Sequence, residues 1–211
     1  MRVIAPDFDR LTERPGAGPL PRPVEIGPED TRFRDLLSLV IDDLPDGSAV
    51  EGHSADGALL LVLLAGAVTI AAGADEHRLD ADGDWALLLP PGQGYRIAVL
   101  APATLAEARV RAHASFAPLA LRPKDGTLAL DGPGLALRLV PLGAGADASA
   151  GLGDAVERLV HLTGPARVTG PEGAHELPPA HTLALAPGEA ARVEGMGEML
   201  VLAALRPGAA L

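Results

Sequence analysis

A set of residues in the first half of the chain returns in the second half, and this internal repeat constrains the fold more than any other feature. The copies share glycines, a histidine-containing segment and a proline–glycine turn: Gly47 recurs as Gly145, Gly66 as Gly164, 77–79 as 175–177, and 91–97 as 187–193. The first three offsets are 98 residues and the last is 96, which indicates a short deletion in a loop of the second copy. Such a repeat predicts two copies of one folding unit.

Each half consists of short apolar runs bounded by Gly, Pro and Asp. Examples are 59–64 and 85–89 in the first half, and 158–162 and 182–185 in the second. Runs of this length, with a turn signal every eight to twelve residues, are typical of β-sandwiches and β-barrels. We therefore expect an all-β fold with few helices.

The predicted domain boundaries follow from the positions of proline and glycine. Residues 1–32 are rich in both, which disfavours helix and central strand and predicts an extended N-terminal arm. Residues 33–121 and 122–211 then hold the two copies of the repeat. The linker near 121–126 has the composition of a turn.

Composition excludes several function classes. The formal net charge of −11 disfavours nucleic acid and anionic membranes as partners. The absence of cysteine removes disulfides, thiolate nucleophiles and thiolate metal sites. The most apolar segment, 58–65, is too short to span a bilayer, and the N-terminus has no signal-peptide pattern. We expect a cytoplasmic protein.

The spacing of the repeated glycines resembles that of the two motifs of the cupin superfamily. In the first copy, motif one runs Gly47, His53, Ala55, Leu59 and Gly66, and motif two runs Gly83, 90–92 and Tyr95. In the second copy, the matching residues are Gly145, Gly151, Gly153, Glu157 and Gly164, then Ala180, Ala186, Gly188 and Ala191. The resemblance implies two tandem cupin-like jelly-roll β-barrels. It covers about three quarters of the chain.

Most of the residues that a cupin uses to hold its metal are replaced. In the first copy only His53 survives, because Ala55, Leu59 and Tyr95 stand at the other three ligand positions. In the second copy only Glu157 survives. A catalytic metal needs at least three well-placed protein ligands. The sequence therefore predicts no metal and no other cofactor.

The first barrel supplies one set of candidate site residues. Tyr95 takes the place of a metal histidine, so its phenol is expected to point into the barrel and to need a polar partner. Strand alternation places Leu59 and Leu61 on the same inward face, together with Ala55. With the surviving His53 and with Trp85, expected in the core, the two leucines form the predicted ligand-binding set. A structural histidine and a solid core are the alternatives for these positions.

In the second barrel, the same alternation aligns Glu157 with His161. We predict that these two side chains face inward as a hydrogen-bonded pair, with space left by Gly151 and Gly153. Together with Tyr95 they are the candidate catalytic residues. The alternative is a purely structural pairing, because a buried charge without a partner is costly.

These features favour a metal-free, bicupin-like protein that binds a small molecule or acts as a structural or regulatory module. The apolar strands and the N-terminal arm suggest a homodimer. The alternative is a cupin enzyme of isomerase, lyase or dioxygenase type. It would act on a small metabolite through Glu157, His161 or Tyr95, or through a metal site formed by other residues.

Overall fold

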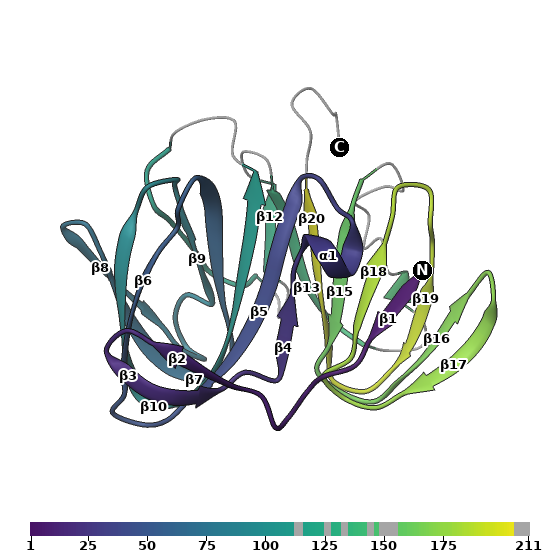
Figure 1. Ribbon diagram of the computed structural model, residues 1–211, viewed down its shortest axis with the longest axis horizontal. Helices are drawn as coiled ribbons and strands as arrows, with labels where there is room; N and C mark the ends of the chain where they lie inside the picture. The colour runs from purple at the N-terminus through teal and green to yellow at the C-terminus, as the bar shows by residue number, and fades with distance from the viewer. Residues whose placement is uncertain (112–115, 125–127, 132–134, 143–145, 148–155, 205–211) are drawn as a thin grey trace. The chain divides into compact units, whose positions relative to one another are not determined.

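The computed structural model describes residues 1–111, 116–124, 128–131, 135–142, 146–147 and 156–204. The described residues form β-strands and one short helix, α1 (Pro28–Thr31), so the prediction of an all-β fold is confirmed (Figure 1). Gly145, Gly151, Gly153 and His113 lie outside the described residues. Within the described part of the chain, no helix has the length and apolar character needed to cross a bilayer.

The chain divides into two compact units, each built from several segments. The first unit, called barrel 1 below, contains residues 7–27 and 37–123. The second unit, called barrel 2, contains residues 1–6, 28–36 and 124–211. The segment expected to form an N-terminal arm is thus ordered and contributes to both units.

Barrel 1 contains an eight-stranded antiparallel sheet and a separate hairpin. The strands are β2 (Leu11–Arg14), β3 (Ala17–Pro21), β4 (Val24–Ile26), β5 (Leu36–Leu44), β6 (Ala49–His53), β7 (Gly57–Ala72), β8 (Asp75–Leu79), β9 (Ala86–Leu89), β10 (Gly94–Arg111) and β11 (Leu119–Leu121). The order in the large sheet is β11-β9-β7-β10-β5-β4, with β6 on β10 and β8 on β7. Strands β2 and β3 pair with each other in a two-stranded sheet.

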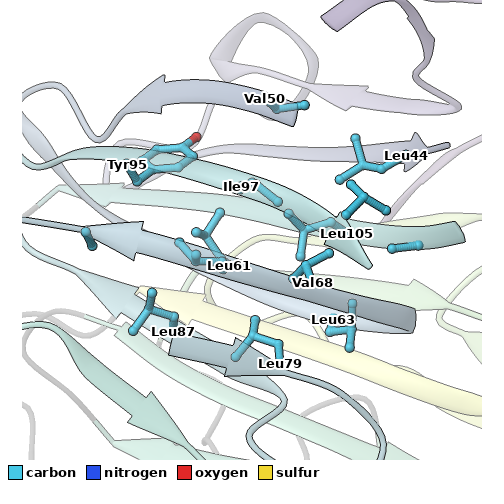
Figure 2. Close-up of a cluster of buried hydrophobic side chains, with 14 of the residues drawn as sticks. Leu44, Val50, Leu61, Leu63, Val68, Leu79, Leu87, Tyr95, Ile97 and Leu105 are labelled. Atoms are coloured by element: carbon cyan, nitrogen blue, oxygen red, sulfur yellow. The ribbon is translucent and has the colours of Figure 1, made fainter. Parts of the chain in front are cut away.

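The core of barrel 1 follows from alternation along its two longest strands. Leu59, Leu61 and Leu63 of β7 point to one side, where they pack with Leu105 of β10 and Leu87 of β9. Figure 2 shows this apolar cluster, with the Tyr95 ring at its edge. The cluster is rich in Leu and Val, as expected for a chain with few aromatic residues.

Barrel 2 is built from two antiparallel sheets. Its strands are β1 (Arg2–Ile4), β12 (Leu128–Asp131), β13 (Leu135–Pro141), β14 (Ala146–Asp147), β15 (Arg158–Leu162), β16 (Ala166–Gly170), β17 (Gly173–Leu177), β18 (Thr182–Leu185), β19 (Arg192–Gly195) and β20 (Glu198–Ala204). The sheet orders are β1-β18-β15-β20-β13-β12 and β14-β19-β16-β17. Val160, Leu162, Leu183, Val193 and Val201 are among the side chains of its core.

Two repeated glycines lie at equivalent tight corners. A Cβ atom on Gly66 would lie 2.1 Å from the carbonyl oxygen of Pro102, and one on Gly164 would lie 2.1 Å from that of Met196. Gly66 also has a positive φ of 89°. Both positions therefore exclude a side chain, because the backbone of another segment of the chain occupies the space.

Candidate functional site

Five polar side chains are gathered at the inner face of barrel 1, and we call them the barrel-1 polar cluster. They are Arg14 at the end of β2, Arg22 after β3, Asp42 of β5, and Tyr95 and Glu107 of β10. The exposed fractions of their side chains are 12% for Arg14, 10% for Arg22, 2% for Asp42 and 5% for Glu107, and Tyr95 is 5% exposed. Four segments of the chain thus bring charge into an otherwise apolar barrel.

The guanidinium of Arg14 lies at the centre of the cluster. Its Nη2 donates to Glu107 Oε1 at 2.7 Å, and its Nη1 to Glu107 Oε2 at 3.3 Å. Nη1 also lies 3.5 Å from Asp42 Oδ2. Burial is the largest single influence and lowers the pKa of Arg14, but the attraction and hydrogen bond of Glu107, together with Tyr95 and Asp42, outweigh burial and raise this pKa. Arg14 is therefore held as a permanent cation.

A second bidentate pair lies beside the first. Arg22 Nε donates to Asp42 Oδ1 at 2.7 Å, and Nη2 donates to Oδ2 at 3.1 Å. Asp42 thus lies between two arginines, with its stronger contacts to Arg22. Paired, parallel N–H···O bonds of this kind fix the carboxylate geometrically as well as electrostatically.

Tyr95 completes the cluster and lies against backbone. Its hydroxyl donates to Glu107 at 3.2 Å and accepts from Arg14 at 3.4 Å. A Cβ atom on Gly52 would lie 2.3 Å from Tyr95 Cζ, so only glycine fits beneath the ring. Burial, together with the negative charge of Glu107, raises the pKa of the phenol. The phenol is therefore neutral at physiological pH.

The sequence predicted the direction of Tyr95 but not its partners. Tyr95 and Glu107 belong to one strand, but register shifts between Val99 and Leu105 separate them. Arg14 is 81 residues from Tyr95 in the chain. The available signal was Glu107 itself, a lone acid in an apolar run that includes Leu105 and Ala106.

The predicted pair of Glu157 and His161 in barrel 2 is not formed. The carboxylate of Glu157 accepts backbone N–H bonds from 34, 35 and 36, at 2.7, 2.9 and 3.0 Å. His161 Nδ1 bonds Thr182 Oγ1 at 3.0 Å instead. Both side chains are buried, so Glu157 anchors a turn and His161 is held within the sheet.

The inward direction predicted for Glu157 and His161 is also wrong. Val160 and Leu162 face the core of barrel 2, so Arg158 shares their face, while Glu157 and His161 point to the opposite face. The reason is a one-residue difference in spacing before the corner glycine. A slip of one residue turns every side chain of a strand to its other face.

The ladder shows which residue takes the predicted place of Glu157. In barrel 1, Leu59 pairs with Leu89, and at the same place in barrel 2, Arg158 pairs with Leu185. Arg158 is fully buried, and its Nη2 donates to the backbone carbonyl of Glu189. The sequence did not reveal Arg158 because an offset of 98, which fits the corner glycines, does not hold in β15, where the offset is 99.

Burial also shifts the titration of His161. Desolvation, with a smaller contribution from nearby His181, lowers the pKa of His161 to about 4. The imidazole is therefore neutral at physiological pH, and its residue is only 4% exposed.

Comparisons with known proteins give structural matches only. No family model matches the chain, and no curated protein matches its sequence. Solved structures do match. Protein Ylba from E. coli has a TM-score of 0.78 at 10% identity, over 99% of this chain and 92% of that one. A putative glyoxylate-induced protein from Pseudomonas aeruginosa gives 0.71 at 11% identity, over 99% and 90% of the two chains.

An oxalate decarboxylase structure matches with a TM-score of 0.67 at 12% identity, over 99% of this chain and 78% of that one. These matched proteins are of cupin type. The chain has a cupin-type fold.

The residues at the cupin metal positions of barrel 1 do not fit a metal. His53 is exposed, and its Nδ1 accepts the N–H of Ala55 at 2.9 Å. Ala55 was predicted to face inward, but it lies exposed in a turn with φ of 56°, outside any strand. Leu59 supplies no donor atom, and Tyr95 bonds to Glu107. Within the described ranges, no three His, Asp or Glu side chains are grouped as a metal site.

The remaining candidates of barrel 1 lie in different environments. Leu59 and Leu61 are fully buried in the cupin core. Trp85 is only half-buried, and its Nε1 donates to the carbonyl of Ala81 at 3.5 Å. The expectation that Trp85 is a core residue is therefore wrong. It directly precedes β9, all four residues of which are buried.

Proposed function

We propose that this protein is a bicupin that binds a small molecule without a resident metal, and that the barrel-1 polar cluster is its ligand site. The observation that carries the proposal is a charged, hydrogen-bonded cluster at the inner face of a cupin-type barrel, around the tyrosine that replaces a metal histidine.

Matching ladders support the two-copy part of the proposal. The β7–β8 hairpin pairs Ile70 with His77, and the β16–β17 hairpin pairs Val168 with His175, both displaced by 98 residues. The corner glycines have the same displacement and the same close backbone approach. Independent folding patterns would not share both the register and the corners.

The contrast with barrel 2 supports a ligand-binding role for the cluster. Glu107 pairs with Leu61 in barrel 1, and Val201 pairs with Val160 at the corresponding place in barrel 2. Ala191 likewise stands where barrel 1 has Tyr95, because Arg96 and Arg192 occupy equivalent ladder positions. The same fold is thus built with apolar residues at both places. Buried ion pairs add little net stability, so the fold alone does not account for the cluster.

Binding is better supported than catalysis. An isomerase or lyase needs an acid or base that a substrate can reach with a pKa near the working pH. The pKa of Tyr95 is raised, that of His161 is lowered to about 4, and both side chains are buried. A dioxygenase would need metal ligands at positions where this chain has Ala55, Leu59 and Tyr95. A homodimer and a cytoplasmic location stay predictions.

Tyr95 is the only tyrosine of the chain, which makes its ring NMR signals a direct reporter of the site. The experiment titrates the EDTA-treated protein with a panel that contains ethylguanidinium, ethylammonium, acetate, ethylurea and glycerol. We expect saturable shifts of the Tyr95 signals with at least one charge class, and loss of that response in Glu107→Gln. A panel that leaves the Tyr95 signals unmoved would contradict the proposal, and so would manganese or iron retained stoichiometrically by the untreated protein through dialysis.

A further inference from the structure

We propose that the barrel-1 polar cluster recognises a small organic cation with a guanidinium group, and that Arg14 is an internal occupant that this ligand displaces. The inference rests on the proposed function, because it assigns the chemical class of the ligand held at that site.

The acceptors around Arg14 form a receptor for a planar cation. Glu107 offers both carboxylate oxygens, at 2.7 and 3.3 Å, and Tyr95 offers its phenolic oxygen at 3.4 Å. Asp42 adds a further carboxylate oxygen at 3.5 Å. A guanidinium presents its donors in a fixed fork that matches a carboxylate, whereas an ammonium acts as a point charge. The arrangement therefore selects a guanidinium.

The charge balance sets the sign of the ligand. If Arg14 leaves, Arg22 keeps its two bonds to Asp42, at 2.7 and 3.1 Å, and that pair stays neutral. Glu107 then keeps only the hydroxyl of Tyr95, at 3.2 Å, and one negative charge remains in a buried site. Such a site attracts a monocation and repels an anion, since a buried carboxylate without a counter-ion is strongly disfavoured.

Arg14 is an incomplete occupant of this receptor. Its Nε is buried and has no hydrogen-bond partner among the described residues, although Nη1 and Nη2 are bonded. A buried donor without a partner costs about 1–3 kcal/mol. A free guanidinium is not tied to the backbone of β2, so it can turn to satisfy its donors or keep a water on the remaining one.

The attachment of Arg14 permits exchange. Arg14 belongs to the β2–β3 hairpin, which forms no ladder with the eight-stranded sheet among the described residues. The hairpin tip is attached through the N–H of Glu51, which donates to the carbonyl of Pro15 at 2.8 Å, and through Ala17 and Leu20, which pack on the core. Withdrawal of the tip would therefore leave the main sheet intact.

The test uses ethylguanidinium, which matches the part of the arginine side chain that Arg14→Ala removes. Ethylurea is the neutral control of similar shape. Calorimetry and the Tyr95 NMR signals report binding to wild type, to Arg14→Ala, and to Arg14→Ala combined with Glu107→Gln. We expect Arg14→Ala to bind ethylguanidinium at least about tenfold more tightly than wild type, which must first displace Arg14. Ethylurea should not bind, and the Glu107→Gln double variant should lose at least about tenfold in affinity.

If Arg14→Ala does not fold, the titration of wild type tests the inference by itself. Ethylguanidinium must then shift the Tyr95 signals of wild type saturably, below the concentration that unfolds the protein. No such shift in wild type, or equal binding of ethylurea and ethylguanidinium by a folded Arg14→Ala, would overturn the inference. If acetate or glycerol moves Tyr95 and ethylguanidinium does not, the ligand class is wrong but the proposed function stands. If no compound moves Tyr95, both fail.

Discussion

Barrel 1 and barrel 2 share corners and ladder register, yet they place polar groups at different interior positions. Barrel 1 has Tyr95 and Glu107 where barrel 2 has Ala191 and Val201, and barrel 2 has Arg158 where barrel 1 has Leu59. Ala191 is buried in the apolar core of barrel 2. The fold of a barrel thus accepts either a polar or an apolar side chain at these positions. Side chains at the inner face therefore carry information about function, whereas the corner glycines carry information about the fold.

The largest expected effect is the removal of one partner from the barrel-1 polar cluster. Glu107→Val, which introduces the residue that barrel 2 has at this place, leaves the buried Arg14 guanidinium with the Tyr95 hydroxyl at 3.4 Å and, as its nearest carboxylate, Asp42 at 3.5 Å. We expect a loss of about 3–5 kcal/mol in the free energy of unfolding, measured by urea denaturation. Exposed Glu51→Val is the matched control and should change stability by no more than about 0.5 kcal/mol. Equal changes in the free energy of unfolding for the two substitutions would mean that the loss of Glu107 is no more costly than the loss of an exposed glutamate.

The pH dependence of stability tests the environment of the buried His161 in barrel 2. The folded pKa of His161 is about 4 and its ordinary value is 6.5, so the unfolded chain binds more protons between these values. Stability therefore falls as the pH drops from 6.5 to 4, by about 3 kcal/mol from this residue. Denaturation at several pH values should show that the free energy of unfolding falls more steeply with decreasing pH in wild type than in His161→Asn. Parallel pH profiles for the two proteins would show that His161 titrates normally in the folded state.

A smaller effect is expected beneath the Tyr95 ring. Gly52→Ala places a methyl group 2.3 Å from Tyr95 Cζ, so the ring must shift from its present position. We expect a loss of about 1–3 kcal/mol, measured by thermal unfolding. Gly94→Ala is the control in the same region, because its Cβ would lie 4.0 Å from the nearest atom, in the His53 ring. If both alanines are tolerated equally, the ring does not depend on contact with the backbone of β6.

The sequence predicted the all-β fold because its apolar runs and turn residues are local signals. It also predicted that Tyr95 needs a polar partner inside the barrel, since alternation along a strand is local too. Arg14 and Asp42 could not be assigned as neighbours of Glu107, because tertiary folding, not spacing, brings β2, β5 and β10 together. For such a cluster, the sequence shows at most isolated charges in apolar surroundings.

The error at Glu157 and His161 has a different physical origin. Side chains alternate between the two faces of a strand, so a one-residue deletion changes the face to which every following side chain points. The glycine corners keep an offset of 98, while the paired residues Leu59 and Arg158 differ by 99. The composition of β15 does not reveal the slip, since Arg158, Leu159, Val160 and His161 are all buried on one face or the other.

We infer that the cupin-type fold of barrel 1 does not need its polar cluster. The direct measurement is the free energy of unfolding of the triple variant Arg14→Met, Tyr95→Phe, Glu107→Val, which leaves the Arg22–Asp42 pair intact. We predict a stability within about 1 kcal/mol of wild type, well above that of Glu107→Val alone, because well-packed apolar residues replace a buried ion pair without penalty. A triple variant as unstable as the single variant, or less stable, would show that the cluster is required for folding and would contradict the account.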